Sequence, residues 1–236
     1  MTMAEPILRV EGVSKRFAGR VALSAVSLQV ARGTITGVIG PNGSGKSTLF
    51  NIIAGTLRPD EGRVFVDSRE ITGASAAEIC SRGVARTFQI SRLFAEMTVL
   101  ENLVAVATSK DDRAAIAQAQ ELLEFLEIGA IAGKWGAELS YGQRKLVEIA
   151  RALMLDPKIL LLDEPFAGIN PRLQNRIVEH LKSLCDKGIT VFFIDHEMRI
   201  VLAECDLVYV LAEGCVVAHG DTESVRQDPK VLDAYF

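Results

Sequence analysis

A glycine-rich segment between an apolar run and a helical pattern constrains the fold of this chain more than any other feature. It reads Gly40-Pro41-Asn42-Gly43-Ser44-Gly45-Lys46-Ser47-Thr48. The apolar run Ile35–Ile39 before it predicts a buried strand, and residues 49–54 after it predict the body of a helix. Glycine permits the close backbone approach and the positive φ that such a joint needs. A strand, a G-x-x-x-x-G-K-S loop and a helix in this order predict a phosphate-binding P-loop.

The chemistry of this loop suits a nucleotide. Backbone N–H groups that line the loop face phosphate oxygens, and the start of the following helix adds partial positive charge. Lys46 is expected to reach the β- and γ-phosphates, and the Ser47 hydroxyl is expected to ligate Mg²⁺. An ordinary glycine-rich turn is the alternative, but every motif position is filled and both flanks match. We therefore expect residues 40–48 to bind the phosphates of a nucleotide.

Composition limits the other classes of protein. The 236 residues are 49% hydrophobic and 24% charged, which fits one globular α/β domain or a domain with an inserted subdomain. The net charge of −4 offers no electrostatic surface for nucleic acid, so no nucleic-acid partner is expected. No apolar run approaches the roughly 20 residues that span a bilayer, and the first residues lack a signal-type segment. The chain is expected in the cytoplasm.

The four cysteines show no C-x-x-C spacing, so we expect reduced, mostly buried thiols and neither a zinc site nor a disulfide. The remaining pattern predicts an α/β core interrupted by helices. Strands are expected at 7–13, 25–30, 62–67, 84–88, 159–163 and 189–195, helices at 99–108, 113–126, 142–155 and 172–187, and a hairpin at 207–212 and 215–218.

Two acids end one of the apolar strands. Asp163 and Glu164 follow residues 159–162, and the carboxyl ends of strands are where α/β sheets place ligands. Asp163 is expected to hold the Mg²⁺ shell, and Glu164 is expected to orient or deprotonate the attacking water. The alternative is that the two acids lie in a surface turn, but the P-loop upstream makes this the weaker interpretation.

A second candidate site opens the predicted helix 142–155. Ser140 is a natural N-cap and Gln143 stands in capping-box position, so a purely structural interpretation is available. The other interpretation is that Ser140, Tyr141, Gly142 and Gln143 bind a γ-phosphate at this helix start. Both can hold for the same atoms.

Together these motifs resemble the ATP-binding subunits of ABC transporters. In that family the P-loop, a Gln-loop, an L-S-G-G-Q signature, an acidic strand end and a switch His follow in this order. The resemblance implies that Gln89 contacts Mg²⁺ and water, that His196 contacts the γ-phosphate, and that Phe17 stacks on adenine. A His after a strand is more often structural, and Phe17 can instead be a core residue at a strand end.

The resemblance extends over essentially the whole chain. It implies one ABC ATPase domain over residues 1–236: a P-loop NTPase core of mainly parallel sheet, an N-terminal antiparallel β subdomain, and a helical subdomain inserted at 90–157. It gives a catalytic set and a metal set: Lys46, Gln89, Glu164 and His196 for catalysis, and Ser47, Gln89 and Asp163 for Mg²⁺.

Several stretches are similar to a narrower group, the subunits that energise uptake of branched-chain amino acids or of urea and amides. These are Arg86-Thr87-Phe88-Gln89, 92–102, Leu139-Ser140-Tyr141-Gly142-Gln143, Gly168-Ile169-Asn170-Pro171 and the end of the chain from Ala218. Tyr141 replaces the first Gly of the signature pair, and Asn170 replaces the usual Asp after the catalytic Glu. We interpret both as variants of this subfamily, without loss of activity.

The resemblance implies a particular assembly. Two such subunits, identical or paralogous, sandwich two ATP molecules, each between one P-loop and the partner's signature. Separate permease chains span the membrane, the ATPase lies on its inner face, and a periplasmic or extracellular protein recognises the solute. The rivals are a lipopolysaccharide-export ATPase, a non-transport ABC ATPase of translation or DNA repair, and a P-loop switch protein.

The segment 89–103 is the expected docking surface for the permease. Ser91-Arg92-Leu93-Phe94 puts two large apolar residues beside a cation, close to the nucleotide-sensing Gln89. Leu93 and Phe94 can instead be core residues of the helical insertion, and the sequence leaves this open.

Overall fold

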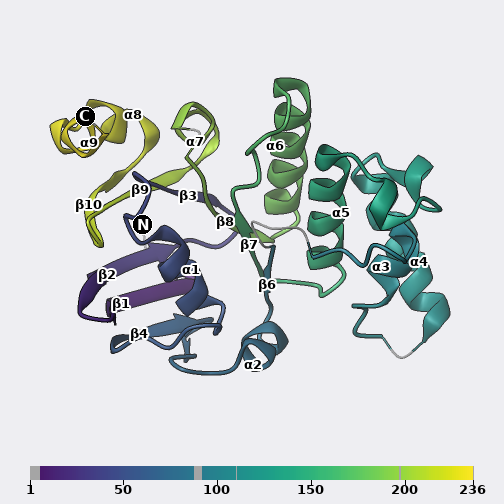
Figure 1. The fold of residues 1–236 in the computed structure, drawn as a ribbon, viewed down its shortest axis with the longest axis horizontal. Helices are drawn as coiled ribbons and strands as arrows, with labels where there is room; N and C mark the ends of the chain where they lie inside the picture. Colours follow the sequence, from purple (N-terminus) through teal and green to yellow (C-terminus); the bar gives the residue numbers. More distant parts are fainter. Residues whose placement is uncertain (1–5, 88–91, 110, 197, 236) are drawn as a thin grey trace.

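Two sheets form the frame of the molecule in the computed structural model, which describes residues 6–87, 92–109, 111–196 and 198–235 (Figure 1). The first sheet is antiparallel and has the strand order β2-β1-β4-β5. Its strands are β1 Leu8–Phe17, β2 Arg20–Val30, β4 Glu61–Val66 and β5 Arg69–Glu70.

The second sheet has the order β10-β9-β3-β8-β7-β6, and its first five strands along the chain run parallel, with β10 antiparallel at one edge. The strands are β3 Ile35–Ile39, β6 Val84–Arg86, β7 Ile159–Asp163, β8 Thr190–Ile194, β9 Leu207–Ala212 and β10 Cys215–Gly220. Every residue of β3, β7 and β8 is buried, as expected of central parallel strands covered on both faces. Because these strands are parallel, their carboxyl ends meet at one edge.

Helix α1 Lys46–Ile53 lies between the two sheets (Figure 1). Its apolar residues share one core with the inner faces of both sheets, and the Phe50 ring lies 5.0 Å from that of Phe192 in β8. This packing fixes the helix that follows the glycine-rich loop against the middle of the second sheet.

The other face of the second sheet carries a second core, shared with helices between β6 and β7 and with α6. These helices are α3 Val99–Val104, α4 Asp112–Phe125, α5 Tyr141–Leu153 and α6 Pro171–Asp186, with short 3₁₀ turns at Gly129–Ile131 and Gly136–Glu138. Capping explains where several begin: Thr98 and Glu101 form a capping box at α3, and Asn170 caps α6 by accepting from the Leu173 N–H at 3.0 Å. Asn170 thus fills a capping position.

The remaining helices are short: α2 Ala76–Ser81, α7 Met198–Glu204, α8 Thr222–Gln227 and α9 Pro229–Tyr235. None of the helices in the described part of the chain is long and apolar enough to cross a membrane. The predicted α/β class with an antiparallel sheet beside a mainly parallel one is confirmed. The bounds 90–157 for a helical subdomain stay a prediction.

Several predicted elements differ in extent. The first two strands are longer than expected, so Phe17 ends β1 and residues 20–24 belong to β2. The helix predicted at 99–108 ends at Val104, because the chain turns there and the Ala107 N–H donates to the Val104 carbonyl. The prediction of mostly buried thiols was wrong: all four cysteines are free, but Cys205 alone is buried.

Candidate functional site

The polar residues singled out in the sequence meet at one edge of the parallel sheet. Gly40 follows β3, Asp163 ends β7, and Asp195 and His196 follow β8. The register of the strands aligns them, since Val38 and Asp163 both pair with Ile194. Parallel sheets bind ligands at this edge.

Close contacts require glycine at two positions of the P-loop. A Cβ at Gly40 would lie 2.0 Å from the Leu211 carbonyl oxygen, and one at Gly45, whose φ is +106°, would lie 2.5 Å from the Ala22 carbonyl oxygen. The Gly214 N–H, in the turn of the β9–β10 hairpin, donates to the Ser44 carbonyl at 3.0 Å. The loop is therefore supported by contacts with strands β2 and β9.

The environments of two side chains of the loop indicate that it binds phosphate. The Ser44 hydroxyl is buried without a hydrogen-bond partner, which is costly unless a ligand supplies one. The Lys46 ammonium is buried and donates to the carbonyls of Gly40 at 2.6 Å and Pro41 at 2.9 Å. Burial lowers the pKa of Lys46, and the carboxylates of Glu164, Asp195 and Asp163 oppose that shift. The loop thus combines a cation and a free hydroxyl in one cradle.

Asp163 is held by a residue that sequence reasoning missed. Arg86 of β6 donates to Asp163 Oδ2 at 3.0 Å and to Asn51 Oδ1 of α1 at 2.7 Å, and the ion-paired side chains are nearly inaccessible. Burial raises the pKa of Asp163, while the hydrogen bond and charge of Arg86 lower it. Oδ1 of Asp163 is buried without a hydrogen-bond partner, as expected of an oxygen that accepts a hydrogen bond from a metal-bound water. Arg86 was noted in the sequence only as part of a subfamily stretch.

Glu164 and His196, predicted from the sequence and the family resemblance as the water-activating acid and the phosphate-contacting His, lie close together. His196 Nδ1 lies 3.8 Å from Glu164 Oε1 and 3.7 Å from Asp195 Oδ1. Asp195 is fully buried and accepts from the main-chain N–H groups of Phe166 and His196. Glu164 has φ +49°, a left-handed conformation that is uncommon for a residue with a Cβ.

The capping box at Ser140 is present: the Gln143 N–H donates to Ser140 Oγ at 3.3 Å, and the Ser140 N–H donates to Gln143 Oε1 at 3.0 Å. The turn packs on the segment that follows β7. A Cβ at Gly142 would lie 2.4 Å from Leu173 Cδ2, and Tyr141 lies over Gly168. Tyr141 is half exposed and available to a partner.

Two remaining predictions concern adenine and Mg²⁺. Phe17 is 47% exposed at the end of β1, with the Lys15 ammonium 5.7 Å from its ring centre. The alternative that Phe17 is a core residue is therefore wrong.

Gln89 lies outside the described residues. Among the described residues no cluster of three or more His, Cys, Asp or Glu side chains is placed to hold a metal.

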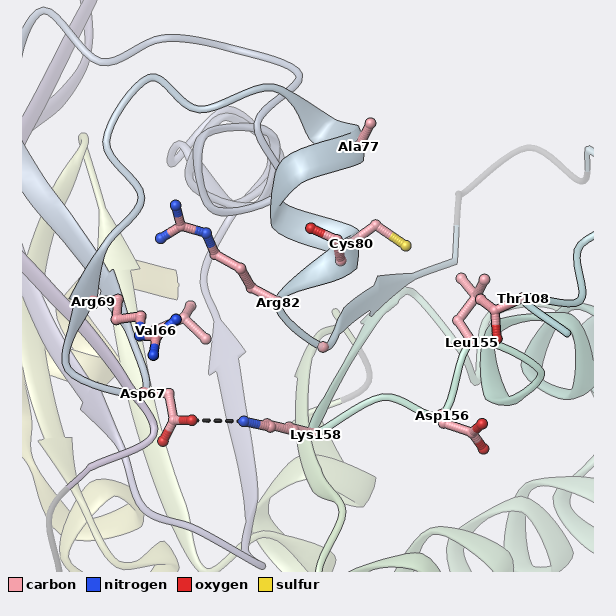
Figure 2. Close-up of a pocket in the computed structure, with 12 residues that line it drawn as sticks. Val66, Asp67, Arg69, Ala77, Cys80, Arg82, Thr108, Leu155, Asp156 and Lys158 are labelled. Atoms are coloured by element: carbon pink, nitrogen blue, oxygen red, sulfur yellow. Dashed lines mark hydrogen bonds and ion pairs between the residues drawn. The ribbon is translucent and has the colours of Figure 1, made fainter.

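A wide pocket of about 640 Å³ lies elsewhere (Figure 2). Gly83 and Lys158 in its lining directly precede β6 and β7, so the pocket is at the amino ends of these strands and at the opposite edge of the sheet from Lys46. Its lining includes the ion pair of Lys158 with Asp67 at 2.6 Å. Hydrogen bonds from Lys158 and Arg32 lower the pKa of Asp67 to about 2. Asp67 is thus ion-paired with Lys158 and Arg32, and the pocket is separate from the phosphate site.

Comparison with known proteins agrees with the geometry. Residues 23–167 match the family model described as ABC transporter, and residues 137–201 also match one described as AAA domain, putative AbiEii toxin, Type IV TA system. A relative from Methanocaldococcus jannaschii, "Probable branched-chain amino acid transport ATP-binding protein LivG", is 41% identical over 98% of this chain and 97% of its own. "High-affinity branched-chain amino acid transport ATP-binding protein BraF" from Pseudomonas aeruginosa is 36% identical over 99% of each chain.

Solved structures agree as well. The ADP conformation of an ATP-binding cassette of an ABC transporter superposes with a TM-score of 0.90 at 41% identity, over 98% of this chain and 99% of that one. A dimeric bacterial ABC transporter cassette gives a TM-score of 0.83 at 28% identity, over 91% and 98%. With its P-loop, acidic strand end and capped signature turn in place, this chain belongs to the ATP-binding subunits of the ABC transporter family.

Proposed function

We propose that this chain hydrolyses ATP to power an importer of branched-chain amino acids or related small solutes. The observation that carries the chemistry is the convergence of Lys46, Asp163 and Glu164 at one sheet edge. The solute class rests on the names of full-length relatives that are 36–41% identical.

Mg²⁺ is part of this proposal. Ser47 and Asp163 are the described residues that fit it, because one offers an exposed hydroxyl and the other a buried oxygen without a partner. Once bound, the ion would neutralise charge on the phosphates. Gln89 completes the proposed metal set.

The chain's own residues have separate tasks. Lys46 and the main-chain N–H groups of residues 40–48 would hold the phosphates, with Ser44 as a further donor. Glu164 would accept a proton from the attacking water, and His196, 3.8 Å away, would contact the γ-phosphate. Phe17 would stack on adenine at the open end of β1.

The complete site needs a second subunit. The Ser140–Gln143 turn packs on residues 168 and 173 and presents an exposed Tyr141. The main-chain N–H groups of Ser140 and Gln143 are used in the capping box, so the Ser140 hydroxyl and the Gly142 N–H are the donors that we propose for a nucleotide held by a partner's P-loop. We therefore expect a sandwich dimer with sites completed in trans, formed with a second copy or with a paralogue.

Permease docking is proposed beside Phe94. This residue is 49% exposed, which contradicts the alternative that it is a core residue, whereas Leu93 is partly buried against the core. The Arg151 guanidinium lies 5.2 Å from the Phe94 ring centre, and its Nη1 donates to the Arg92 carbonyl at 2.6 Å. A groove of about 180 Å³ adjoins them, lined by Arg86, Thr87, Val106 and Glu148 among others. An exposed aromatic beside a cation is the composition of an interface anchor.

This docking places the ATPase on the inner face of the membrane. An extracytoplasmic solute-binding protein would deliver the solute to the permease.

The decisive experiment replaces Glu164 by Gln. Loss of a general base costs about 10²–10⁴-fold in rate, so hydrolysis should nearly stop while ATP binding and a closed dimer persist. Glu179→Gln on the exposed face of α6 is the matched control and should hydrolyse ATP normally. Near-normal turnover in the Glu164 variant would remove this residue from the proposed role.

The solute class needs a separate assay. Reconstituted with its permeases in vesicles, the wild-type chain should support ATP-dependent uptake of labelled leucine. Stimulation of hydrolysis by urea or amides alone would assign it to the related uptake group instead.

A further inference from the structure

Two parts of the proposed site that serve different nucleotides are packed together in this chain. The Ser140–Gln143 turn would face the ATP held by the partner subunit, whereas Glu164 would act on the ATP in its own P-loop. The signature turn and the segment after Glu164 are in close contact. A Cβ at Gly142 would lie 2.4 Å from Leu173 Cδ2, and one at Gly168 would lie 3.2 Å from Tyr141 Cε1.

Lys145 joins these two parts directly. It lies one helical turn after Tyr141 in α5, so both side chains are on one face, and its ammonium is 5.7 Å from the Tyr141 ring centre. The residue is only 6% exposed, and Nζ donates to the Glu164 carbonyl oxygen at 3.0 Å. Lysine is rarely buried without a dedicated partner, so this main-chain contact accounts for its position.

The contact falls on a residue with an unusual backbone conformation. Glu164 has φ +49°, which is disfavoured for any residue with a Cβ. Its N–H donates to the Ile194 carbonyl at 2.9 Å, and its carbonyl accepts from Lys145 Nζ at 3.0 Å and from the Ala167 N–H at 3.4 Å. The Lys145 bond joins Glu164 to α5, and together these hydrogen bonds hold the backbone from which the Glu164 side chain leaves.

We infer that Lys145 is a positioning residue that couples occupancy of the signature turn to the orientation of Glu164 in the same subunit. The inference rests on the proposed sandwich dimer. When a partner's nucleotide draws in the start of α5, Lys145 moves with the helix and carries the Glu164 carbonyl with it. Each nucleotide thereby sets the geometry of the acid that acts on the other one.

The test uses the full-length protein with Lys145→Met, which keeps the length of the side chain and removes its donors. A misplacement near 1 Å costs up to about 100-fold, so kcat should fall about 10- to 100-fold. KM and the affinity for ATP should change less than about two-fold, because the P-loop is untouched. We expect a Hill coefficient for ATP above 1 in the wild type and a value of 1 in Lys145→Met, and Lys145→Arg should restore most of kcat.

Lys182→Met is the matched control, since this α6 lysine pairs with Glu204 at the surface, and it should leave kcat and the Hill coefficient unchanged. Should Lys145→Met fail to fold, Lys145→Gln replaces it, because its shorter amide does not reach the Glu164 carbonyl.

Three results would overturn the inference: normal kcat in Lys145→Met or Lys145→Gln, a parallel loss of ATP affinity and thermal stability, or a Hill coefficient of 1 in an active wild type. A wild type without ATP hydrolysis would instead refute the proposed function.

Discussion

Replacing Asn102 by alanine tests what holds the loop of residues 92–98. Asn102 is fully buried in α3, and its amide makes four hydrogen-bond contacts with main-chain atoms. Oδ1 accepts from the Phe94 N–H at 2.8 Å, and Nδ2 donates to the carbonyls of Phe94, Met97 and Thr98 at 3.0–3.2 Å. One side chain thus fixes both ends of this loop.

The cost follows from these bonds. The Nδ2 group has two hydrogens, so its three contacts share two donors and the amide makes three full hydrogen bonds with the one accepted by Oδ1. A hydrogen bond contributes about 0.5–1.5 kcal/mol net, so three give about 1.5–4.5 kcal/mol. The Phe94 main chain can regain water because its residue is exposed, which favours the lower part of that range. We expect Asn102→Ala to lower the free energy of unfolding by about 1.5–3 kcal/mol. For a chain of this size that lowers Tm by roughly 3–12 °C.

Urea denaturation and calorimetry measure the change, with Asn175→Ala as the matched control. Asn175 is exposed within α6, where alanine is the better helix former, so this variant should be as stable as the wild type or slightly more so. A loss below about 0.5 kcal/mol in Asn102→Ala would mean that the loop is held by other contacts and would refute the reasoning.

Three further outcomes are expected. Phe17→Ala should weaken ATP binding by about 1–3 kcal/mol and GTP binding similarly, as titration with fluorescent nucleotides will show; unchanged affinity would place adenine against another residue. Lys46→Ala and Ser140→Arg chains should each be inactive but regain ATPase activity on mixing, since one site of the mixed dimer is intact; continued inactivity of proven mixed dimers, or a rate linear in protein at all dilutions, would argue against sites completed in trans. Phe94→Ala should keep basal ATPase activity and Tm while losing recruitment to permease-containing vesicles; full coupling to uptake would move the docking surface elsewhere.

The sequence predicted the parts of the site that depend on local pattern. The P-loop lies between β3 and α1 because an apolar run, glycines and a helix start are all contiguous in the chain. Asp163 and Asp195 could likewise be placed at strand ends from the apolar runs before them. The capping box at Ser140 is a three-residue spacing and was predicted for the same reason.

The residues that were missed act through contacts between distant segments. Arg86 and Asp163 are 77 positions apart, and their ion pair exists only because β6 and β7 are neighbours in the sheet. Lys145 looks like a surface residue of an amphipathic helix until the loop after β7 is packed over it. The exposure of Phe17 also depended on how far β1 extends, which apolar alternation did not define.

The β9–β10 hairpin turn contacts the P-loop, and this matters for the design of truncated fragments of the chain. The match to the family ends at residue 167, yet the floor of the nucleotide loop is built from Leu211 and Gly214. The Gly214 carbonyl also accepts from the Ser24 N–H, so the same turn ties the loop to β2. A fragment that keeps every recognisable motif but stops before β9 would have the sequence of a phosphate-binding loop without its shape. Insertions or labels at the 213–214 turn should disturb nucleotide affinity for the same reason, although this turn follows the last motif residue along the chain.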